Sequence, residues 1–153
     1  MTQDELYDWC LARQGRELHV SDWLTVTQER INRFAAATDD YQWIHVDAAR
    51  AVADSPWKST IAHGFLTLSL YPYLRGVADG DTWPGVRTVI NCGVNQTRFV
   101  SAVTVGSQIR LRTTLSSAVA VHGCVQIEED CVYELAGQPK PACVAQVVLR
   151  LYC

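Results

Sequence analysis

The chain has 153 residues with 13 Lys or Arg and 16 Asp or Glu, so its formal net charge is −3, and its length fits one domain over residues 1–153. The acidic balance and the lack of clustered Lys and Arg argue against nucleic acid as a partner, because phosphate binding needs such clusters. Charged residues make up 19% of the chain, below the roughly 25% of typical soluble domains, which favours a surface covered by a second copy of the chain.

The six cysteines include no C-x-x-C pair, and their spacing fits neither a zinc site nor a small disulfide framework. We therefore expect buried free thiols in a reducing compartment. The segment Met1–Leu6 is acidic and does not have the charged-then-apolar layout of a signal peptide. The longest apolar run is also too short for the ~20 residues that span a bilayer. The sequence thus predicts a cytoplasmic protein with neither a metal site nor a membrane segment.

The first part of the chain has the pattern of short helices and one extended segment. Apolar residues at helical spacing predict a helix over residues 3–13, which Gly15 ends. Residues 19–26 alternate loosely in polarity and predict a strand or an extended arm. Thr25 or Thr27 can cap a second helix. That helix leads the chain to an acidic turn.

The acidic turn places a carboxylate and an imidazole five residues apart, at Asp40 and His45. The residues between them lack helical apolar spacing, so we expect a turn that points both side chains into one cleft. Asp47 can then cap a short helix over residues 48–53, which Pro56 ends because a proline disfavours helix in the residue before it.

Residues 62–74 are apolar nearly all round, which predicts one helix buried on most sides, with Pro72 kinking or shortening its last turn. The second half of the chain instead contains four runs rich in Val, Ile and Thr, separated by turn signals near Gly106, Gly123 and Gly137. The runs cover residues 87–100, 107–118, 120–135 and 142–152. Helices followed by an antiparallel meander indicate an α+β fold.

Three segments carry a resemblance to a known family: TDDYQWIHVD at residues 38–47, IAHGFL at 61–66 and NCGVNQTRF at 91–99. Together they resemble the MaoC-like or hydratase-2 family of hot-dog-fold proteins, the (R)-specific enoyl-CoA hydratases, and within it the NodN-like subgroup. The chain departs from the usual family pattern at Asp39, where the family has a glycine, and at Trp43, where it has a proline. The resemblance implies a hot-dog fold, an antiparallel curled sheet wrapped around a long central helix.

A hydratase acting on an enoyl thioester needs a group that takes a proton from water, a group that gives a proton to the α-carbon, and donors to the enolate oxygen. Asp40 and His45 can supply the first two by holding one water between them, because His titrates near neutrality and burial raises the pKa of Asp. The backbone N–H of Gly64, in the first turn of a helix, has no intrahelical acceptor and can donate to the thioester oxygen. The expected catalytic residues are therefore Asp40, His45 and Gly64.

Five other residues are candidates for contact with the substrate. Gln42 can fix the acidic turn by hydrogen bonding. His63 can line the pocket or satisfy a backbone carbonyl, and Ser69 can reach the acyl chain or bond its own helix. The family resemblance puts the strand that carries Asn95 and Arg98 along the substrate channel, where they can meet the pantetheine or phosphates of coenzyme A. The alternative for these two residues is a polar outer face of the sheet.

Lys58 and Arg75 are further candidates for the coenzyme A phosphates. The resemblance predicts a homodimeric hydratase that adds water to trans-2-enoyl-CoA to give (R)-3-hydroxyacyl-CoA, or catalyses the reverse dehydration. Coenzyme A enters as part of the substrate, and no cofactor is expected. A hot-dog acyl-CoA thioesterase and a non-catalytic module that binds acyl-CoA or a signal molecule are the alternatives. In the expected dimer the sheets pair edge to edge, with the two buried helices on one side.

Overall fold

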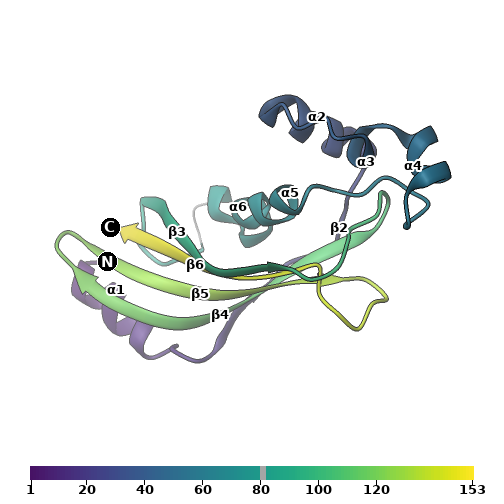
Figure 1. The fold of residues 1–153 in the computed structure, drawn as a ribbon. Helices are drawn as coiled ribbons and strands as arrows, with labels where there is room; N and C mark the ends of the chain where they lie inside the picture. The colour runs from purple at the N-terminus through teal and green to yellow at the C-terminus, as the bar shows by residue number, and fades with distance from the viewer. Residues whose placement is uncertain (80–81) are drawn as a thin grey trace.

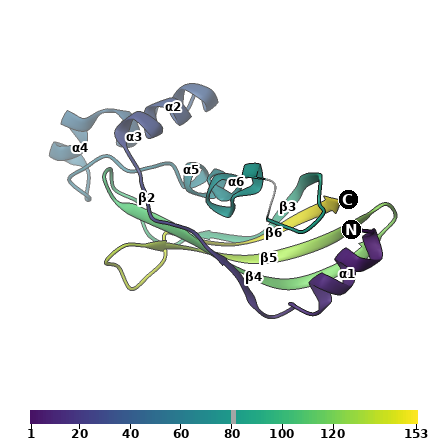
Figure 2. The ribbon, with the colours of Figure 1, turned by 180° about the vertical axis from the view of Figure 1, so that it is seen from behind.

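The computed structural model describes residues 1–79 and 82–153 and consists of one curled antiparallel sheet with helices on its concave side (Figure 1). The strand order is β1-β4-β5-β6-β3, and β2 pairs with β4 beside β1. Seen from behind, α2, α3 and α4 lie together at one end of the sheet and the two termini lie at the other (Figure 2). Within the described residues, no helix has the length and apolar character needed to span a membrane. The predicted α+β class is confirmed.

The elements follow the predicted order of helices first and strands afterwards. The helices are α1 (Gln3–Leu11), α2 (Gln28–Thr38), α3 (Trp43–Val46), α4 (Ala48–Asp54), α5 (Gly64–Ser69), α6 (Tyr71–Arg75) and the 3₁₀ turn η1 (Val77–Asp79). The strands are β1 (Glu17–Val20), β2 (Leu24–Thr25), β3 (Thr88–Phe99), β4 (Gln108–Val121), β5 (Cys124–Leu135) and β6 (Cys143–Tyr152).

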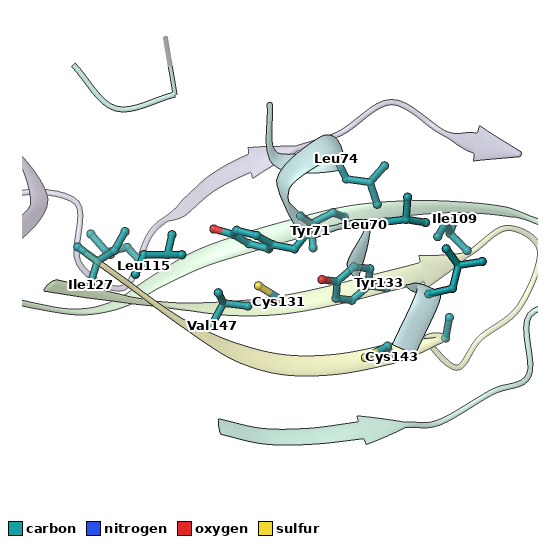
Figure 3. Packing of buried hydrophobic residues seen from close by; sticks show 14 of the residues in the cluster. Leu70, Tyr71, Leu74, Ile109, Leu115, Ile127, Cys131, Tyr133, Cys143 and Val147 are labelled. Carbon is teal, nitrogen blue, oxygen red and sulfur yellow. The ribbon is translucent and has the colours of Figure 1, made fainter. Parts of the chain in front are cut away.

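The core lies between the concave face of the sheet and α5–α6. Strand side chains alternate between the two faces, and in β6 every second residue from Cys143 to Leu151 is buried. Leu70, Tyr71 and Leu74 point from the helices towards the residues that face them from the sheet (Figure 3). The long antiparallel ladders therefore present one continuous apolar face to the helices.

Two predicted boundaries shift because long-range pairing decides them. β4 continues through Val121, and its partner strand begins only at Cys124, after a turn in which Gly123 has a positive φ of 79°. Residues 19–26 do not form one strand, since β1 and β2 pair with different parts of β4. Thr27 caps α2, its Oγ1 accepting the Arg30 N–H at 3.2 Å.

The predicted central helix over residues 62–74 is two short helices. Pro72 has no N–H to donate to the carbonyl of Leu68 four residues earlier, and that carbonyl instead accepts the Tyr133 hydroxyl at 3.1 Å. The helix is also less buried than its composition suggests, because Phe65 is 67% and Tyr73 is 64% exposed in the single chain. The carbonyl freed at the break thus ties the helical segment to β5 through Tyr133. The side of the helices that carries Phe65 and Tyr73 is exposed to solvent.

All six cysteines are free. Four are buried, as predicted, whereas Cys92 and Cys153 are exposed. Burial raises the pKa of both Cys10 and Cys143 to about 11. These two thiols are therefore protonated near neutral pH, so they act as small apolar side chains.

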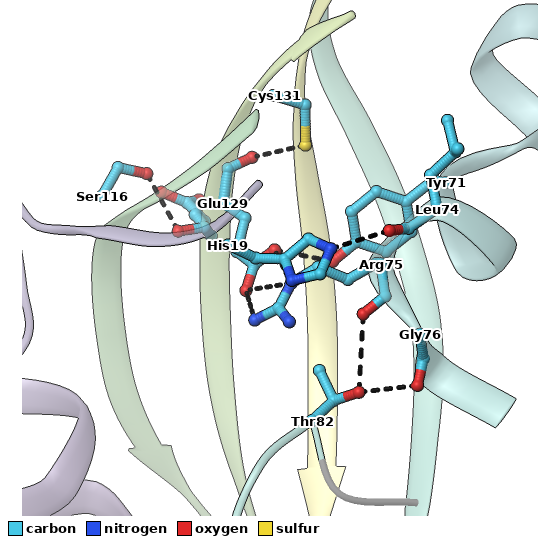
Figure 4. A network of polar contacts seen from close by, with 10 residues as sticks. His19, Tyr71, Leu74, Arg75, Gly76, Thr82, Ser116, Glu129 and Cys131 are labelled. Atoms are coloured by element: carbon cyan, nitrogen blue, oxygen red, sulfur yellow. Dashed lines mark hydrogen bonds and ion pairs between the residues drawn. The ribbon is translucent and has the colours of Figure 1, made fainter. Parts of the chain in front are cut away.

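An ion pair inside the core joins α6 to β5 (Figure 4). The Arg75 guanidinium, 4% exposed, contacts the fully buried Glu129 carboxylate, with Nη2 2.9 Å from Oε1 and Nε 3.0 Å from Oε2. The Tyr71 hydroxyl donates to Oε2 at 2.8 Å, and the Trp83 ring lies 4.5 Å from the guanidinium carbon. Burial and the nearby Glu129 raise the pKa of Tyr71 well above its usual range. The prediction that Arg75 could bind a coenzyme A phosphate is wrong, because its guanidinium is buried and already paired.

Arg75→Met is expected to lower the free energy of unfolding by about 3–5 kcal/mol, because it leaves the Glu129 carboxylate buried without its cation. Adding Glu129→Gln should recover part of this loss, since the amide oxygen is neutral and can still accept from Tyr71. Urea denaturation followed by circular dichroism measures both variants. A wild-type midpoint for Arg75→Met would contradict the burial of this pair.

Candidate active site

The loop after α2 has the backbone geometry that the acidic motif requires. Asp39 ends α2 in the left-handed region, with φ 57° and ψ 21°, a conformation that glycine adopts most easily and Asp tolerates. Trp43 is the first residue of α3, a position where a proline is also favourable because its N–H needs no intrahelical partner. The two departures from the family pattern are therefore compatible with the same backbone path.

The predicted turn between Asp40 and His45 is partly helical. Asp40 Oδ1 accepts the Gln42 N–H at 3.3 Å, and Gln42 precedes the one-turn helix α3, which carries His45. Asp47 caps α4 as predicted, its Oδ1 accepting the Arg50 N–H at 3.0 Å. Short-range hydrogen bonds thus fix the chain on both sides of His45.

The imidazole of His45 is held by a backbone carbonyl. The ring is 7% exposed, and its Nδ1 donates to the Ile61 oxygen at 2.7 Å. In the neutral ring Nε2 therefore carries the free lone pair and can accept a proton. The Asp40 side chain is 51% exposed, so the carboxylate beside this ring is open to water and to a ligand.

His63 contacts both members of the Asp40–His45 pair. Its Nε2 donates to the Asp40 backbone oxygen at 3.0 Å and lies 3.9 Å from Asp40 Oδ2. Its ring stacks on the His45 ring, with centroids 3.8 Å apart and planes tilted by 25°. The centroid of the Phe34 ring lies 5.0 Å from that of His63. His63 is 3% exposed, and its Nδ1 has no hydrogen-bond partner among the described residues. The structure thus supports the predicted bond to a backbone carbonyl.

The segment before α5, residues 61–63, is hydrogen-bonded to other parts of the fold. The Ile61 N–H donates to the Ile44 oxygen at 3.0 Å, and the Ala62 N–H donates to the Val103 oxygen at 2.8 Å. Ile61 also forms a β-bridge with Thr104. The start of α5 and the acidic turn are therefore tied together by main-chain bonds.

Four influences act on the pKa of His45, and the largest is burial, which lowers it. The hydrogen bond to the Ile61 carbonyl raises the pKa, the neighbouring His63 lowers it, and the Asp40 carboxylate raises it. The net shift is downward from 6.5. His45 is therefore neutral at pH 7 and able to take up a proton.

One donor atom each from Asp40, His45 and His63 lies within 4.8 Å of the others. A metal ion binds an imidazole nitrogen about 2.0–2.1 Å away and in the plane of the ring. The stacked planes of the two histidines do not share such a point, and the His63 Nε2 that lies near the Asp40 carboxylate already donates to the Asp40 backbone oxygen. The cluster is therefore better suited to moving a proton than to holding a metal.

Gly64 lies next to His63 and begins α5. The Leu66 and Thr67 N–H groups both bond to the His63 oxygen, whereas no acceptor for the Gly64 N–H occurs among the described residues. A Cβ at Gly64 would lie 2.8 Å from the Phe99 ring, so only glycine fits this approach of β3 to the helix. Both predicted explanations of this glycine, a free amide and close packing, fit its surroundings.

The remaining predicted substrate contacts are exposed in the single chain. Ser69 is exposed on α5. Asn95 donates to Gln146 Oε1 at 3.1 Å, and Arg98 donates to the backbone oxygen of its neighbour Thr97 at 2.8 Å. Their contacts with a substrate stay a prediction.

The structure adds a cleft that the sequence did not reveal. It lies between α2 and α5 and has a volume of about 350 Å³. Its lining residues are Thr27, Glu29, Arg30, Arg33, Phe34 and Leu66. Nothing in the local pattern links α2 to α5, because their residues come together only through the tertiary fold.

Comparison with known proteins identifies the class to which this fold and site belong. The MaoC like domain family matches residues 11–132. The R-hydratase PhaJ1 from Pseudomonas aeruginosa in the unliganded form has a similar fold, with a TM-score of 0.67 at 21% identity over 91% of this chain and 81% of that one. The sheet and helices are those of a hot-dog fold, as predicted.

Two relatives are closer in sequence. A 3-hydroxyacyl-thioester dehydratase Z from Mycobacterium tuberculosis (strain ATCC 25618 / H37Rv) is 45% identical over 140 residues, 91% of each chain. Nodulation protein N from Rhizobium meliloti (strain 1021) is 39% identical over 135 residues, which is 86% of this chain and 81% of that protein. The chain belongs to the MaoC-like dehydratase family.

The opposite influences of His63 and Asp40 on His45 can be measured separately. His63→Phe keeps an aromatic ring in the stack but removes the neighbouring imidazole that lowers the His45 pKa, so this pKa should rise. Asp40→Asn removes the carboxylate that raises the His45 pKa, so the pKa should fall further. NMR titration of the His45 ring resonances gives both values. Shifts in the same direction would contradict these assignments.

Proposed function

We propose that this protein adds water to trans-2-enoyl-CoA to give (R)-3-hydroxyacyl-CoA, or removes water in the reverse direction. The observation that carries the proposal is the geometry of the site. One ligand atom of His45 and one of Asp40 lie within 4.8 Å of each other, and the Gly64 N–H at the start of α5 has no acceptor among the described residues. The names of the relatives support the reaction class, since one is a 3-hydroxyacyl-thioester dehydratase. The name of a structural neighbour, an R-hydratase, supports the stereochemistry by analogy of fold.

In this proposal Asp40 and His45 hold one water between them. The water oxygen attacks C3 of the enoyl group while a water proton passes to the pair, with His45 accepting through Nε2. The π electrons of the C2–C3 bond move onto the thioester oxygen, which accepts a hydrogen bond from the Gly64 N–H. A proton from the pair then reaches C2, so the addition is complete and the pair returns to its starting state.

His63 positions this pair in the same scheme. It donates to the Asp40 backbone and stacks on His45, so it fixes the distance between the two groups that share the water. Geometry of this kind matters because a misplacement of about 1 Å can cost about 10²-fold in rate.

A dimer would complete the surroundings of the site. β3 lies at the end of the strand order, so its outer backbone N–H and C=O groups have no partner strand among residues 1–79 and 82–153 of the single chain. Ile90, Val94, Phe99 and Val100 on or beside this strand are exposed apolar residues, and Phe99 packs against the site glycine. We therefore propose that two copies pair through β3.

Light scattering should give about twice 17.0 kDa for this protein. Val94→Pro in the middle of β3 should shift the protein towards the monomer, because a proline removes a donor from the ladder and fits poorly in a paired strand. A wild-type monomer at micromolar concentration would contradict the dimer.

Asp40→Asn and His45→Gln should each lower kcat by at least about 10²-fold, because each removes a group that moves a proton. The double variant should be little worse than either single one if both groups hold the same water. Loss of enoyl absorbance with crotonyl-CoA measures turnover, and chiral analysis of the product measures its configuration. Release of free thiol would instead indicate a thioesterase, and binding without turnover would indicate a binding module.

Asp39→Asn is the matched control for the two active-site variants. Asp39 has the same side chain as its neighbour but ends α2 and has no proton to move in the scheme, so the rate should change far less. Thermal melts show whether each variant is folded. An inactive Asp39→Asn beside a fully active Asp40→Asn would overturn the assignment of the base, and an (S) product would overturn the stereochemical proposal.

A further inference from the structure

The cleft between α2 and α5 adjoins the candidate active site. Its volume of about 350 Å³ lies within the roughly 300–1,000 Å³ of small-molecule sites. Phe34 and Leu66 supply apolar lining, and the Phe34 ring lies 5.0 Å from the His63 ring. The Phe99 ring lies against Gly64 at the start of α5. Phe34 therefore lies both in the lining of the cleft and beside the active-site histidine His63.

The cleft also contains a cation that lacks a carboxylate partner. Arg33 is paired, with Nη2 2.5 Å from Glu29 Oε1, and both side chains are exposed. Arg30 is half-buried, and in the described part of the chain no carboxylate lies within 4.0 Å of it. Its guanidinium carbon lies 5.7 Å from the centre of the Tyr73 ring.

Charged side chains are almost never fully buried without a partner, whereas the half-buried Arg30 guanidinium stays in reach of water and keeps N–H donors for a ligand. A cation–π contact at the protein surface is worth only about 0.5–1 kcal/mol. The planar guanidinium binds carboxylate or phosphate through two parallel hydrogen bonds. Arg30 thus offers unpaired N–H donors to an anion in a cleft that Phe34 and Leu66 also line.

We propose that the α2–α5 cleft binds one arm of the thioester substrate and that Arg30 pairs with an anionic group on that arm. This rests on the proposed function, since it takes the ligand to be an acyl thioester. Two sources supply the same chemistry. One is a phosphate of the coenzyme A carrier, and the other is a carboxylate at the far end of the acyl chain.

Binding of unreactive saturated thioesters tests this separately from catalysis. Isothermal titration calorimetry compares wild type and Arg30→Gln with butyryl-CoA, butyryl-pantetheine and glutaryl-CoA, the last of which carries a terminal carboxylate. A hydrogen bond to a charged group contributes about 1.5–3 kcal/mol, so Arg30→Gln should weaken binding of the anionic ligand by about 10- to 100-fold. Turnover of crotonyl-CoA by the wild type tests the hydratase proposal independently.

The pattern across the three ligands identifies the source of the anion. If Arg30 binds a carrier phosphate, Arg30→Gln weakens both CoA thioesters and leaves butyryl-pantetheine unchanged. If it binds an acyl carboxylate, only glutaryl-CoA is weakened. Equal affinities of wild type and variant for all three ligands, or equal losses for all three, would overturn the proposal, as would a wild type that binds none of them.

Arg13→Gln is the matched control. Arg13 follows the end of α1 and, like Arg30, lies over an aromatic ring, with its guanidinium carbon 4.1 Å from the centre of the Trp9 ring. The substitution makes the same change in net charge far from the cleft, so the affinities should stay at the wild-type values. A loss equal to that of Arg30→Gln would show a general effect of charge and would overturn the assignment to Arg30.

Discussion

The candidate site depends on a short extended segment, Ile61 to Gly64, that holds the acidic turn by three hydrogen bonds, one of them from the Ile61 N–H to the Ile44 oxygen. The Ile61 oxygen fixes the His45 ring, and the His63 ring donates to the Asp40 backbone. The same segment ends at Gly64, so one piece of chain sets the position of the imidazole, the carboxylate and the free amide together. A further hydrogen bond, from Gln28 Nε2 to the His45 backbone oxygen at 2.8 Å, ties the turn to the start of α2.

This segment is in turn held by the way α5 and α6 sit on the sheet. The Tyr133 hydroxyl bonds the carbonyl that Pro72 leaves free, and the Arg75–Glu129 pair joins the end of α6 to β5. A buried ion pair is weak evidence for net stability, because desolvation offsets much of its attraction. Its geometric effect is direct, since it fixes the end of α6 against Glu129 in β5.

Much of the site could be predicted because local rules govern its backbone. Thr27 and Asp47 cap the helices that flank the acidic turn, as expected of side chains that accept hydrogen bonds from free N–H groups. The left-handed residue at Asp39 and the first helical position at Trp43 explain why a glycine and a proline suit these places in the family. Sequence alone did not show that the turn contains a helical segment, because four residues are too few to have a period.

The sequence by itself determined the α+β order of elements, the strand pattern, the helix caps and the pairing of Asp40 with His45 in one motif, since each depends on residues near one another in the chain. Only the tertiary structure decided that Arg75 is buried against Glu129, that His63 supports the pair, and that Arg30 lies in a cleft with Leu66. These relations join α6 to β5, α5 to the acidic turn, and α2 to α5. No local propensity specifies them, because they arise only when the apolar faces of the helices pack on the sheet.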